Sequence, residues 1–405
     1  VSEPMNVLTQ QQRIAELAKQ SPEMSFHSLS HHMDVDWLRE AYGKLKKSSS
    51  PGTDGVTVEA YGQNLSDNLN TLLDRAKSGR YIAPPVRRAH LPKPDAPTET
   101  RPIGVPTTED KVLQRAVAML LEPIYEQDFL GCSYGFRPGR SPHQALDELW
   151  RSVMGKGGGW VLEVDIRKFF DTLDRAHLRR LLRKRVRDGV ILRLIGKWLN
   201  AGVLEDEQLS YPERGTPQGG VISPLLSNIY LHYVLDLWFE HEVKPRLAGR
   251  AALIRFADDF VIVFQSKTDA EQVMRVLPKR FAKYGLSIHP DKTRLVRFAP
   301  SRNGTAKPGT FDFLAFTHYW GKSRRGTWVV KRKTAKSRLR RAMVATWQWC
   351  RKSRHRPLPE QHAALCRKLR GHYGYYGITG NHRSLTLYWQ RVRQAWQYWL
   401  NRRNR

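Results

Sequence analysis

The sequence is poor in cysteine, in acidic residues and in long apolar runs, and each shortage excludes a class of protein. Its three cysteines, Cys132, Cys350 and Cys366, are too few for a disulfide framework and suit a reducing compartment. We find no secretory leader and no apolar run near the ~18 residues that a membrane-spanning helix requires. We therefore expect a protein of a reducing compartment that has no membrane partner.

Acidic residues number 38 against 68 Lys and Arg, which gives a formal net charge of +30. A folded chain keeps such self-repelling charge when a polyanion offsets it, and nucleic acid is the first candidate. The excess is concentrated in residues 321–405, which contain 23 Lys or Arg and a single acid, Glu360. Six of the 12 tryptophans lie in the same stretch. They can stack on unpaired bases, or they can form the core of a basic helical bundle.

The mixture of helical and strand patterns predicts an α+β fold with a helical C-terminal unit. With 405 residues and 40% hydrophobic content, the chain is long enough for two or three folding units. Residues 83–106 are Pro-rich and extended. Helical spacing of apolar residues covers residues 58–76, 109–124, 176–200, 222–238 and 270–284, and a basic helical pattern begins near residue 333. Short apolar strands are predicted over residues 160–165, 252–256, 260–264 and 311–319.

Three aspartates stand at the ends of apolar strands. Asp165 ends the run that begins at Trp160, and Asp258 and Asp259 lie at the tip of a predicted hairpin. Carboxylates beside apolar strands are costly unless a cation compensates them, and hard oxygen ligands favour Mg²⁺. Two such ions can activate a 3′-hydroxyl and stabilise a leaving pyrophosphate. An Asp-Asp pair is also common in turns, so the pair alone does not distinguish a metal site from an ordinary hairpin.

The order of the motifs resembles that of the reverse transcriptases. Residues 256–259, Phe-Ala-Asp-Asp, are similar to the (Tyr/Phe)-x-Asp-Asp box of that family, and residues 164–171 to its first catalytic block. Further similar blocks follow the family's order and spacing: residues 101–106, 134–141, 215–228, 285–293 and 313–316. The resemblance implies a right-hand polymerase. Its N-terminal extension and fingers would cover residues 1–150, its palm residues 151–320, and its basic helical thumb residues 321–405.

The resemblance also implies roles for single residues. Two Mg²⁺ ions would be held by Asp165, Asp258, Asp259 and the backbone carbonyl of Ile166. The incoming nucleotide would be bound by Lys93, Arg101, Phe170, Gln218 and Lys292.

These nucleotide-binding residues have different expected tasks. Lys93 and Arg101 would clamp the triphosphate, whose charge grows in the transition state. Phe170 would crowd a ribose 2′-hydroxyl and so select deoxynucleotides, although a core position beside Phe169 is the alternative. Gln218 would lie in a glycine turn close to the template and primer, and Lys292 would act as a general acid near the pyrophosphate.

The segment from Leu369 to Gly377, with Asn381, is similar to the maturase segment of group II intron-encoded reverse transcriptases, which retron and diversity-generating enzymes generally lack. The resemblance implies RNA contacts by Arg370, His372, Tyr373, Tyr375, Tyr376 and Asn381. The sequence ends at Arg405 without the Cys-rich His-Asn-His endonuclease that members often add, so we expect the endonuclease-lacking type.

The expected function is RNA-directed DNA synthesis combined with binding of an intron RNA, which assists splicing and retromobility. The implied partners are a group II intron RNA, an RNA template with a DNA primer, dNTPs and target DNA, in a ribonucleoprotein of the bacterial cytoplasm. Two alternatives stay open. One is a domesticated or CRISPR-associated reverse transcriptase. The other is a non-catalytic RNA-binding splicing factor, against which the three aspartates and the Gln218 turn argue.

Overall fold

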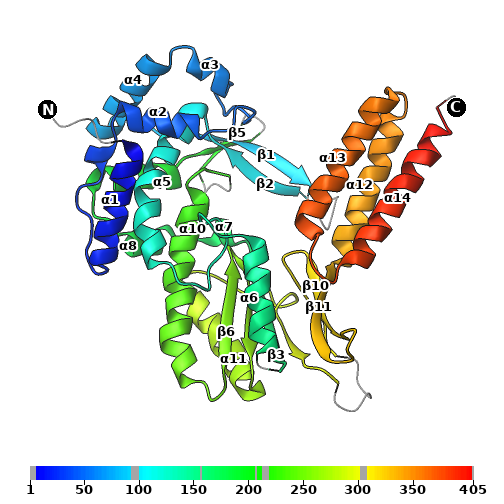
Figure 1. Cartoon of the computed structure of the whole chain (residues 1–405). Helices are drawn as coiled ribbons and strands as arrows, with labels where there is room; N and C mark the ends of the chain where they lie inside the picture. The colour runs from blue at the N-terminus through cyan, green and yellow to red at the C-terminus, as the bar shows by residue number, and fades with distance from the viewer. Residues whose placement is uncertain are drawn as a thin grey trace.

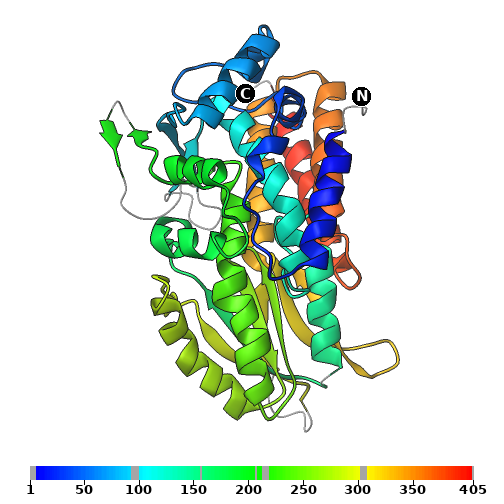
Figure 2. The ribbon, with the colours of Figure 1, turned by 90° about the vertical axis from the view of Figure 1, so that its left-hand side faces the viewer.

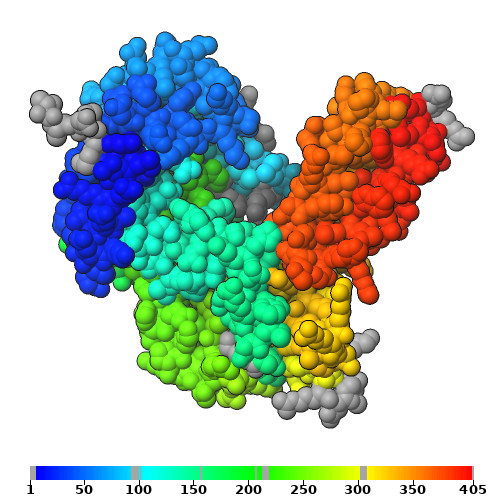
Figure 3. All heavy atoms as spheres, viewed as in Figure 1, coloured from blue at the N-terminus to red at the C-terminus, as the bar shows by residue number. Residues whose placement is uncertain are grey.

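The computed structural model describes residues 6–92, 100–155, 157–205, 208–211, 219–301 and 308–403, without the side chain of Arg101. Two lobes rise from a central sheet (Figure 1). A hollow separates the blue and cyan N-terminal lobe from the orange and red C-terminal helices (Figure 3). We call this hollow the cleft. No helix of the described residues is long and apolar enough to cross a membrane.

The central sheet has four strands in the order β6-β7-β3-β8, and every neighbouring pair is antiparallel. The strands are β3 (Gly159–Asp165), β6 (Ala251–Phe256), β7 (Asp259–Phe264) and β8 (Arg294–Phe298). Successive side chains point to opposite faces, so the continuous apolar run of residues 260–264 in β7 buries both faces. Phe260 and Ile262 of β7 belong to a large core that reaches the N-terminal helices, whereas Val261 and Val263 belong to a second core.

Helices on both faces complete this layer. Helix α11 (Lys267–Ala282) packs against β3, and α6 (Pro142–Met154) packs against β6 on the side of the second core. Helix α10 (Ser223–Leu231) continues through π-helical turns, His232–Asp236 and Trp238–Val243, and a 3₁₀ turn, Lys244–Arg246. The predicted helix over 222–238 is thereby confirmed, with a wider winding in its second half.

A second four-stranded sheet, in the order β2-β1-β4-β5, belongs to the N-terminal lobe. Its strands are β1 (Val86–Pro92), β2 (Thr100–Val105), β4 (Val203–Glu205) and β5 (Gln208–Ser210). In its described residues, the predicted extended segment over 83–106 is therefore confirmed, as an antiparallel pair that reaches toward the C-terminal helices (Figure 1). Strand β4 pairs in parallel with β1. The second sheet therefore combines strands from before and after residue 150, the position at which the sequence analysis divides fingers from palm.

The N-terminal helices pack around α5 (Thr108–Asp128), which is buried along most of its length and capped by the Thr107 hydroxyl. They are α1 (Val7–Gln20), α2 (Val35–Gly43), α3 (Val58–Gly62) and α4 (Leu65–Ser78), with a 3₁₀ turn at Ser30–His32. The prediction of one helix over 58–76 was wrong. The chain breaks at Gly62, which lies against the Tyr42 hydroxyl, and restarts at Leu65.

The predicted single helix over 176–200 is also two helices. Helix α7 (Phe169–Thr172) precedes them, and they are α8 (Arg175–Leu182) and α9 (Gly189–Leu199). The buried carboxylate of Asp188 accepts the N–H groups of Val190 and Ile191 and so caps the start of α9. A side-chain cap outcompetes continuation of α8 through this point.

The C-terminal part begins with a three-stranded sheet, β11-β10-β9, where the sequence predicted a single strand over 311–319. Its strands are β9 (Phe311–Phe313), β10 (Phe316–Lys322) and β11 (Trp328–Thr334). Helices α12 (Lys336–Ser353), α13 (Leu358–Tyr376) and α14 (His382–Leu400) follow, as the basic helical pattern predicted. These helices have a core of their own, which contains Cys350, Leu365, Tyr388, Val392 and Ala395.

Candidate active site

Strand pairing brings two aspartates side by side at one end of the central sheet. Asp165 is the last residue of β3 and Asp259 is the first residue of β7, and the two are direct partners in the antiparallel ladder. Such partners project from the same face with Cβ atoms about 4.5–5.5 Å apart. The turn between β6 and β7 consists of Ala257, which has a left-handed φ of 58°, and Asp258. Asp258 is therefore the residue directly before Asp259. The three aspartates therefore lie at the same end of the sheet.

The charges of these carboxylates oppose one another. The pKa of Asp259 is raised to about 7, first by the surrounding protein and then by the negative charges of Asp258 and Asp165. Asp259 is nevertheless exposed to solvent. The cation that lowers its pKa is Arg338, at the start of α12. Concentrated, solvent-reachable negative charge of this kind fits a divalent cation.

Lys292 is the present partner of Asp165, with Nζ 3.0 Å from the carboxylate Oδ2. No three His, Cys, Asp or Glu side chains of the described ranges are gathered closely enough to hold a metal ion as they stand. A cation at the aspartates would therefore replace Lys292 as the partner of Asp165. The predicted proximity of Lys292 to the catalytic block is found, whereas its general-acid role stays a prediction.

The loop that carries Lys292 is fixed to the end of β3 by backbone contacts. His289 donates its N–H to the Asp165 carbonyl at 2.8 Å, and Arg167 donates its N–H to the Ser287 carbonyl at 2.8 Å. These two bonds flank the isolated bridge between Ile166 and Ile288. Neither of them uses the Ile166 carbonyl, the oxygen predicted to bind a metal ion.

Beneath the hairpin tip lies a buried ion pair that the sequence analysis did not single out. Arg255 is completely buried and binds both carboxylate oxygens of Asp236, at 2.8 Å from Nε and 2.5 Å from Nη2. Its remaining N–H groups reach Asn228 Oδ1, Ser133 Oγ and the Ala257 carbonyl at 2.8–3.0 Å. The Ala257 carbonyl belongs to the turn that carries Asp258. Arg255 therefore connects the hairpin tip to α10 and to the loop before α6.

The loop before α6 also presses directly on the hairpin tip. A Cβ on Gly135 would collide with the backbone of Ala257, so only glycine permits this approach. The carbonyl of Gly135 accepts a hydrogen bond of 2.7 Å from Asn228 Nδ2. The next residue, Phe136, is exposed and has its ring 6.4 Å from that of Phe256. Residues 134–141, which resemble a fingers block, thus contact the predicted metal site.

The predicted nucleotide-binding residues are only partly described. Lys93 and Gln218 lie outside the described residues, and Arg101 is described in its backbone alone, opposite Leu91 in the β1–β2 ladder. Phe170 is half-buried and packs edge-to-face on buried Phe169, with ring centroids 5.3 Å apart. Phe169 therefore fills the core position, and the steric-gate role of Phe170 stays a prediction.

Comparison with known proteins agrees with this geometry. Residues 91–318 match the family model described as "Reverse transcriptase (RNA-dependent DNA polymerase)". The chain is 33% identical over 325 residues to Protein YkfC of Escherichia coli strain K12, covering 72% of the chain and 85% of that protein. The chain belongs to the reverse transcriptase family. It is also similar to the group II intron-encoded protein LtrA of Lactococcus lactis subsp. cremoris, at 35% identity over 239 residues.

A third relative of this reverse transcriptase is an uncharacterized 91 kDa protein in a cob intron of Schizosaccharomyces pombe, 34% identical over 314 residues. The matches cover 59% of the chain for LtrA and 65% for the cob intron protein. They span only 36% and 38% of those two proteins, respectively. Together these relatives place the chain among the group II intron reverse transcriptases and maturases.

The maturase-like segment of this reverse transcriptase joins the C-terminal helices to the rest of the molecule. The Tyr375 hydroxyl donates to the Leu314 carbonyl at 3.0 Å, and the Tyr375 carbonyl lies 2.8 Å from His143 Nε2 on α6. Asn381 is buried, accepts the Thr334 N–H at 2.8 Å and donates to the Thr334 hydroxyl at 2.9 Å. Its amide is thus used within the protein. These hydrogen bonds give Asn381 a structural role, and its RNA contact stays a prediction.

The other residues predicted to bind RNA differ in exposure. Arg370 is exposed on α13, whereas Tyr373 is half-buried against the core of the helices. The ring of His372 lies 4.5 Å from that of Tyr376 and 4.1 Å from that of Tyr388, in an aromatic stack within the protein. Burial lowers the pKa of His372 below its ordinary value. Arg370 remains the member of this group that is best placed to meet a phosphate.

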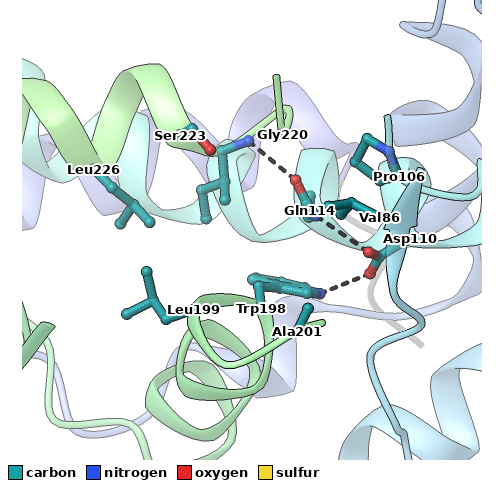
Figure 4. A pocket seen from close by; sticks show the side chains of 11 residues that line it. Val86, Pro106, Asp110, Gln114, Trp198, Leu199, Ala201, Gly220, Ser223 and Leu226 are labelled. Atoms are coloured by element: carbon teal, nitrogen blue, oxygen red, sulfur yellow. Dashed lines mark hydrogen bonds between the residues drawn. The ribbon is translucent and has the colours of Figure 1, made fainter. Parts of the chain in front are cut away.

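A buried carboxylate supports the foot of the Gly219–Gly220 turn in this reverse transcriptase. Gly219 (φ 118°) lies against the backbone of Gly104 in β2, where a side chain would collide. Beside it is a cavity of about 20 Å³, room for about one water molecule, lined among others by Gly220 and Asp110 (Figure 4). Asp110 accepts hydrogen bonds from Tyr81, from Trp198 Nε1 at 2.7 Å and from Gln114 at 3.4 Å.

Burial raises the pKa of Asp110 to about 6, from an ordinary value of 3.8. The neutral carboxyl is therefore favoured in the folded state, and folding stability falls as the pH rises from about 4 through about 6. We expect Asp110→Asn to remove this dependence, so that the variant gains roughly 3 kcal/mol relative to the wild type between pH 4 and pH 7. Urea unfolding of both proteins at each pH measures the difference. A constant difference across this range would contradict the raised pKa.

Proposed function

We propose that this chain is an RNA-directed DNA polymerase that also binds a group II intron RNA and assists its splicing, in a cytoplasmic ribonucleoprotein. The observation that carries the polymerase function is the ladder pairing of Asp165 with Asp259, beside Asp258, at an end of the central sheet that water reaches. Its substrates would be dNTPs and an RNA template with a DNA primer, and target DNA would supply the acceptor strand.

Asp165, Asp258 and Asp259, with the carbonyl of Ile166, would hold two Mg²⁺ ions. Bound ions of this type supply the charge that activates a 3′-hydroxyl and stabilises the departing pyrophosphate. The mutual repulsion that raises the pKa of Asp259 supports this proposal, because a divalent cation relieves it. Lys292, displaced from Asp165, would stay close enough to donate a proton or a positive charge to the pyrophosphate.

The C-terminal helices support the RNA-binding part of the proposal. They carry 12 of the 23 Lys and Arg of residues 321–405, and the aromatic rings of Trp347, Trp389 and Tyr398 are exposed on them. Arg393 lies 5.2 Å from the centroid of Trp389, and Arg402 lies 3.6 Å from that of Tyr398. Rings paired with arginines form surfaces on which unpaired bases stack while phosphates are neutralised.

A primer-extension assay tests the polymerase function. We expect the purified chain to extend a DNA primer on an RNA template in the presence of Mg²⁺ and dNTPs, and to stop when a chelator is added. Omission of the RNA template or of one dNTP is the control for template-directed synthesis. A protein that binds the template and primer but adds no nucleotide at any Mg²⁺ concentration would overturn the polymerase proposal and favour a non-catalytic splicing factor.

A further inference from the structure

A groove of about 1060 Å³ lies in the N-terminal lobe, between the segment that leads into β1 and helices α8 and α9. Its apolar surface includes Pro84, Pro85 and Leu192. None of its lining residues belongs to the central sheet or to helices α12–α14. Hairpin β4–β5, next to the groove, projects at the left of Figure 2, where the C-terminal helices lie behind the N-terminal ones. The groove is therefore separate from the catalytic carboxylates.

Among the described residues, five cations and no carboxylate line the groove. The cations are Arg179, Arg183, Arg187, Arg193 and Lys197, and none of them forms a salt bridge with an acid of the described residues. Like charges gathered without a counter-charge are unfavourable unless an anion occupies the site. The repulsion is visible at neighbouring Arg175, whose pKa is lowered by burial and then by the charge of Arg179.

The two acids of residues 175–205 do not offset this charge, because both are bound elsewhere. Residues 175–205 contain nine Lys or Arg and two acids, Asp188 and Glu205. Asp188 accepts four backbone N–H groups, two of them at the start of α9. Glu205 pairs with Arg88 and His90.

Two of the five cations also have a structural task. On α9, Lys197 Nζ donates to the Gly79 carbonyl at 2.7 Å, and Arg193 Nη2 donates to the Lys77 carbonyl at 3.2 Å. These carbonyls end helix α4, where cations are favoured by the helix dipole. Arg179, Arg183 and Arg187 follow one another at intervals of four residues and are the cations best placed for an external anion.

An exposed aromatic ring borders the same groove. Tyr211, just after β5, lines it and is 66% exposed. A tyrosine ring beside arginines can stack on an unpaired base while the guanidinium groups contact its phosphates. A small anion would need neither the ring nor three arginines spread from α8 into the loop before α9. The combination fits a nucleic-acid strand better than a free phosphate.

We propose that this groove binds RNA outside the polymerase cleft, with Arg179, Arg183 and Arg187 on phosphates and Tyr211 stacked on an unpaired base. The proposal rests on the proposed RNA-binding function and deepens it by naming a second contact surface. Charge complementarity selects the occupant, since a chain of net charge +30 that binds RNA elsewhere meets RNA phosphates first. The template and primer would occupy the cleft, and another part of the same RNA would occupy the groove.

The test uses the full chain with Arg179, Arg183 and Arg187 replaced by Gln, and a labelled RNA stem-loop with a single-stranded tail as the probe. We expect the affinity to fall about tenfold or more, and the slope of log K against log salt to decrease by about two to three. The matched control replaces the exposed residues Arg275 and Lys279 on α11, and Lys283 just after it, by Gln and removes the same charge. We expect that control to stay within about twofold of the wild type.

The aromatic contact has its own test. We expect Tyr211→Ala to weaken binding of the tailed stem-loop about tenfold and to leave binding of a tailless stem-loop unchanged, because only an unpaired base can stack. Tyr211→Phe keeps the ring and should restore the affinity. Equal losses for tailed and tailless RNA would overturn the stacking contact.

The outcomes separate this inference from the proposed function. If the wild type binds no RNA and extends no primer, the proposed function fails. If the wild type binds RNA and the triple Gln variant binds it equally well with an unchanged salt slope, the groove proposal alone is overturned. The groove would then be assigned to a different polyanion, such as an acidic protein. Primer extension on a short template should remain at the wild-type level in the triple variant, which also shows that it is folded.

Discussion

Replacing Asp258 and Asp259 together by Asn is expected to abolish primer extension while RNA affinity stays within about twofold of the wild type. The substitution removes carboxylates proposed to hold Mg²⁺, which contributes several kcal/mol of charge stabilisation in the transition state. A loss of 4 kcal/mol corresponds to about a thousandfold in rate, so extension should fall by at least that factor. The RNA contacts proposed on the C-terminal helices and the groove use other residues and should persist.

Stability serves as the control for this experiment. The raised pKa of Asp259 indicates that the neighbouring carboxylates repel one another in the folded protein. Amides of nearly the same shape remove that repulsion, so the melting temperature of the variant should equal or exceed that of the wild type. Extension at a rate within tenfold of the wild type would refute the catalytic role of the two aspartates. Loss of RNA binding in a folded variant would instead refute the separation of the two surfaces.

The second large effect is expected at the buried pair of Arg255 and Asp236. Arg255→Met leaves the Asp236 carboxylate uncompensated, and Asp236→Asn leaves the guanidinium in the same state. Removing one partner of a completely buried pair costs about 3–5 kcal/mol. We expect either variant to lose that amount of folding free energy, measured by urea unfolding. Both should also extend primers more slowly. Arg255→Met removes the hydrogen bond from Arg255 to the Ala257 carbonyl, and Asp236→Asn allows the Arg255 guanidinium that donates it to move.

A double variant separates the structural part of this effect from the positioning part. Asp236→Leu combined with Arg255→Met removes both charges and should recover a substantial part of the stability, because an apolar pair of similar volume needs no compensation. The Ala257 carbonyl nevertheless stays without its donor. We therefore expect kcat to remain low and the Mg²⁺ concentration for half-maximal extension to rise. Full recovery of kcat and of the Mg²⁺ dependence would show that the pair acts through stability alone.

An ion pair on the protein surface serves as the control for the buried pair of Arg255 and Asp236. Lys267 and Glu271 lie 3.1 Å apart on the surface of α11, and both are exposed. Lys267→Met should change the folding free energy by about 0–1 kcal/mol and leave extension unchanged. A loss there equal to that of Arg255→Met would mean that any charge removal harms this protein.

Three strands of the central sheet were predictable because their runs are mainly apolar, whereas the fourth, β8, was not predicted. The runs 160–165, 252–256 and 260–264 coincide with β3, β6 and β7 to within one residue. The apolar runs did not predict that β3 pairs with β7, because the partner and register of a strand depend on residues distant in sequence. It was the ordered series of motifs that connected Asp165 with the hairpin tip.

Helix breaks were harder to predict than helix positions. Apolar spacing continues across both Gly62 and Asp188, so each pair of helices reads as one. The breaks are decided by tertiary contacts that periodicity does not contain: Tyr42 against Gly62, and Asp188 bound to backbone N–H groups of two segments. Local propensity gives way to such contacts.

Parts of the site had a signal in the sequence that we did not use. Arg255 stands inside an otherwise apolar strand, and Asp236 stands inside an otherwise apolar helix. A charge buried on such an element needs an opposite partner, so the two could have been matched. Arg338 had no such signal, because it is one of many cations in residues 321–405 and reaches Asp259 only through the path of α12.

The central sheet also fixes when this protein can first become active during its synthesis. Its four strands come from segments between residues 159 and 298, and its second core needs β9–β11 as well. A ribosome that adds roughly 5–20 residues per second releases α5 on the order of ten seconds before β8. The N-terminal helices can therefore fold early, whereas the carboxylates meet only after most of the chain has emerged. A nascent or prematurely terminated chain that lacks β7 and β8 would expose the apolar strand β3 and would lack the pairing of Asp165 with Asp259.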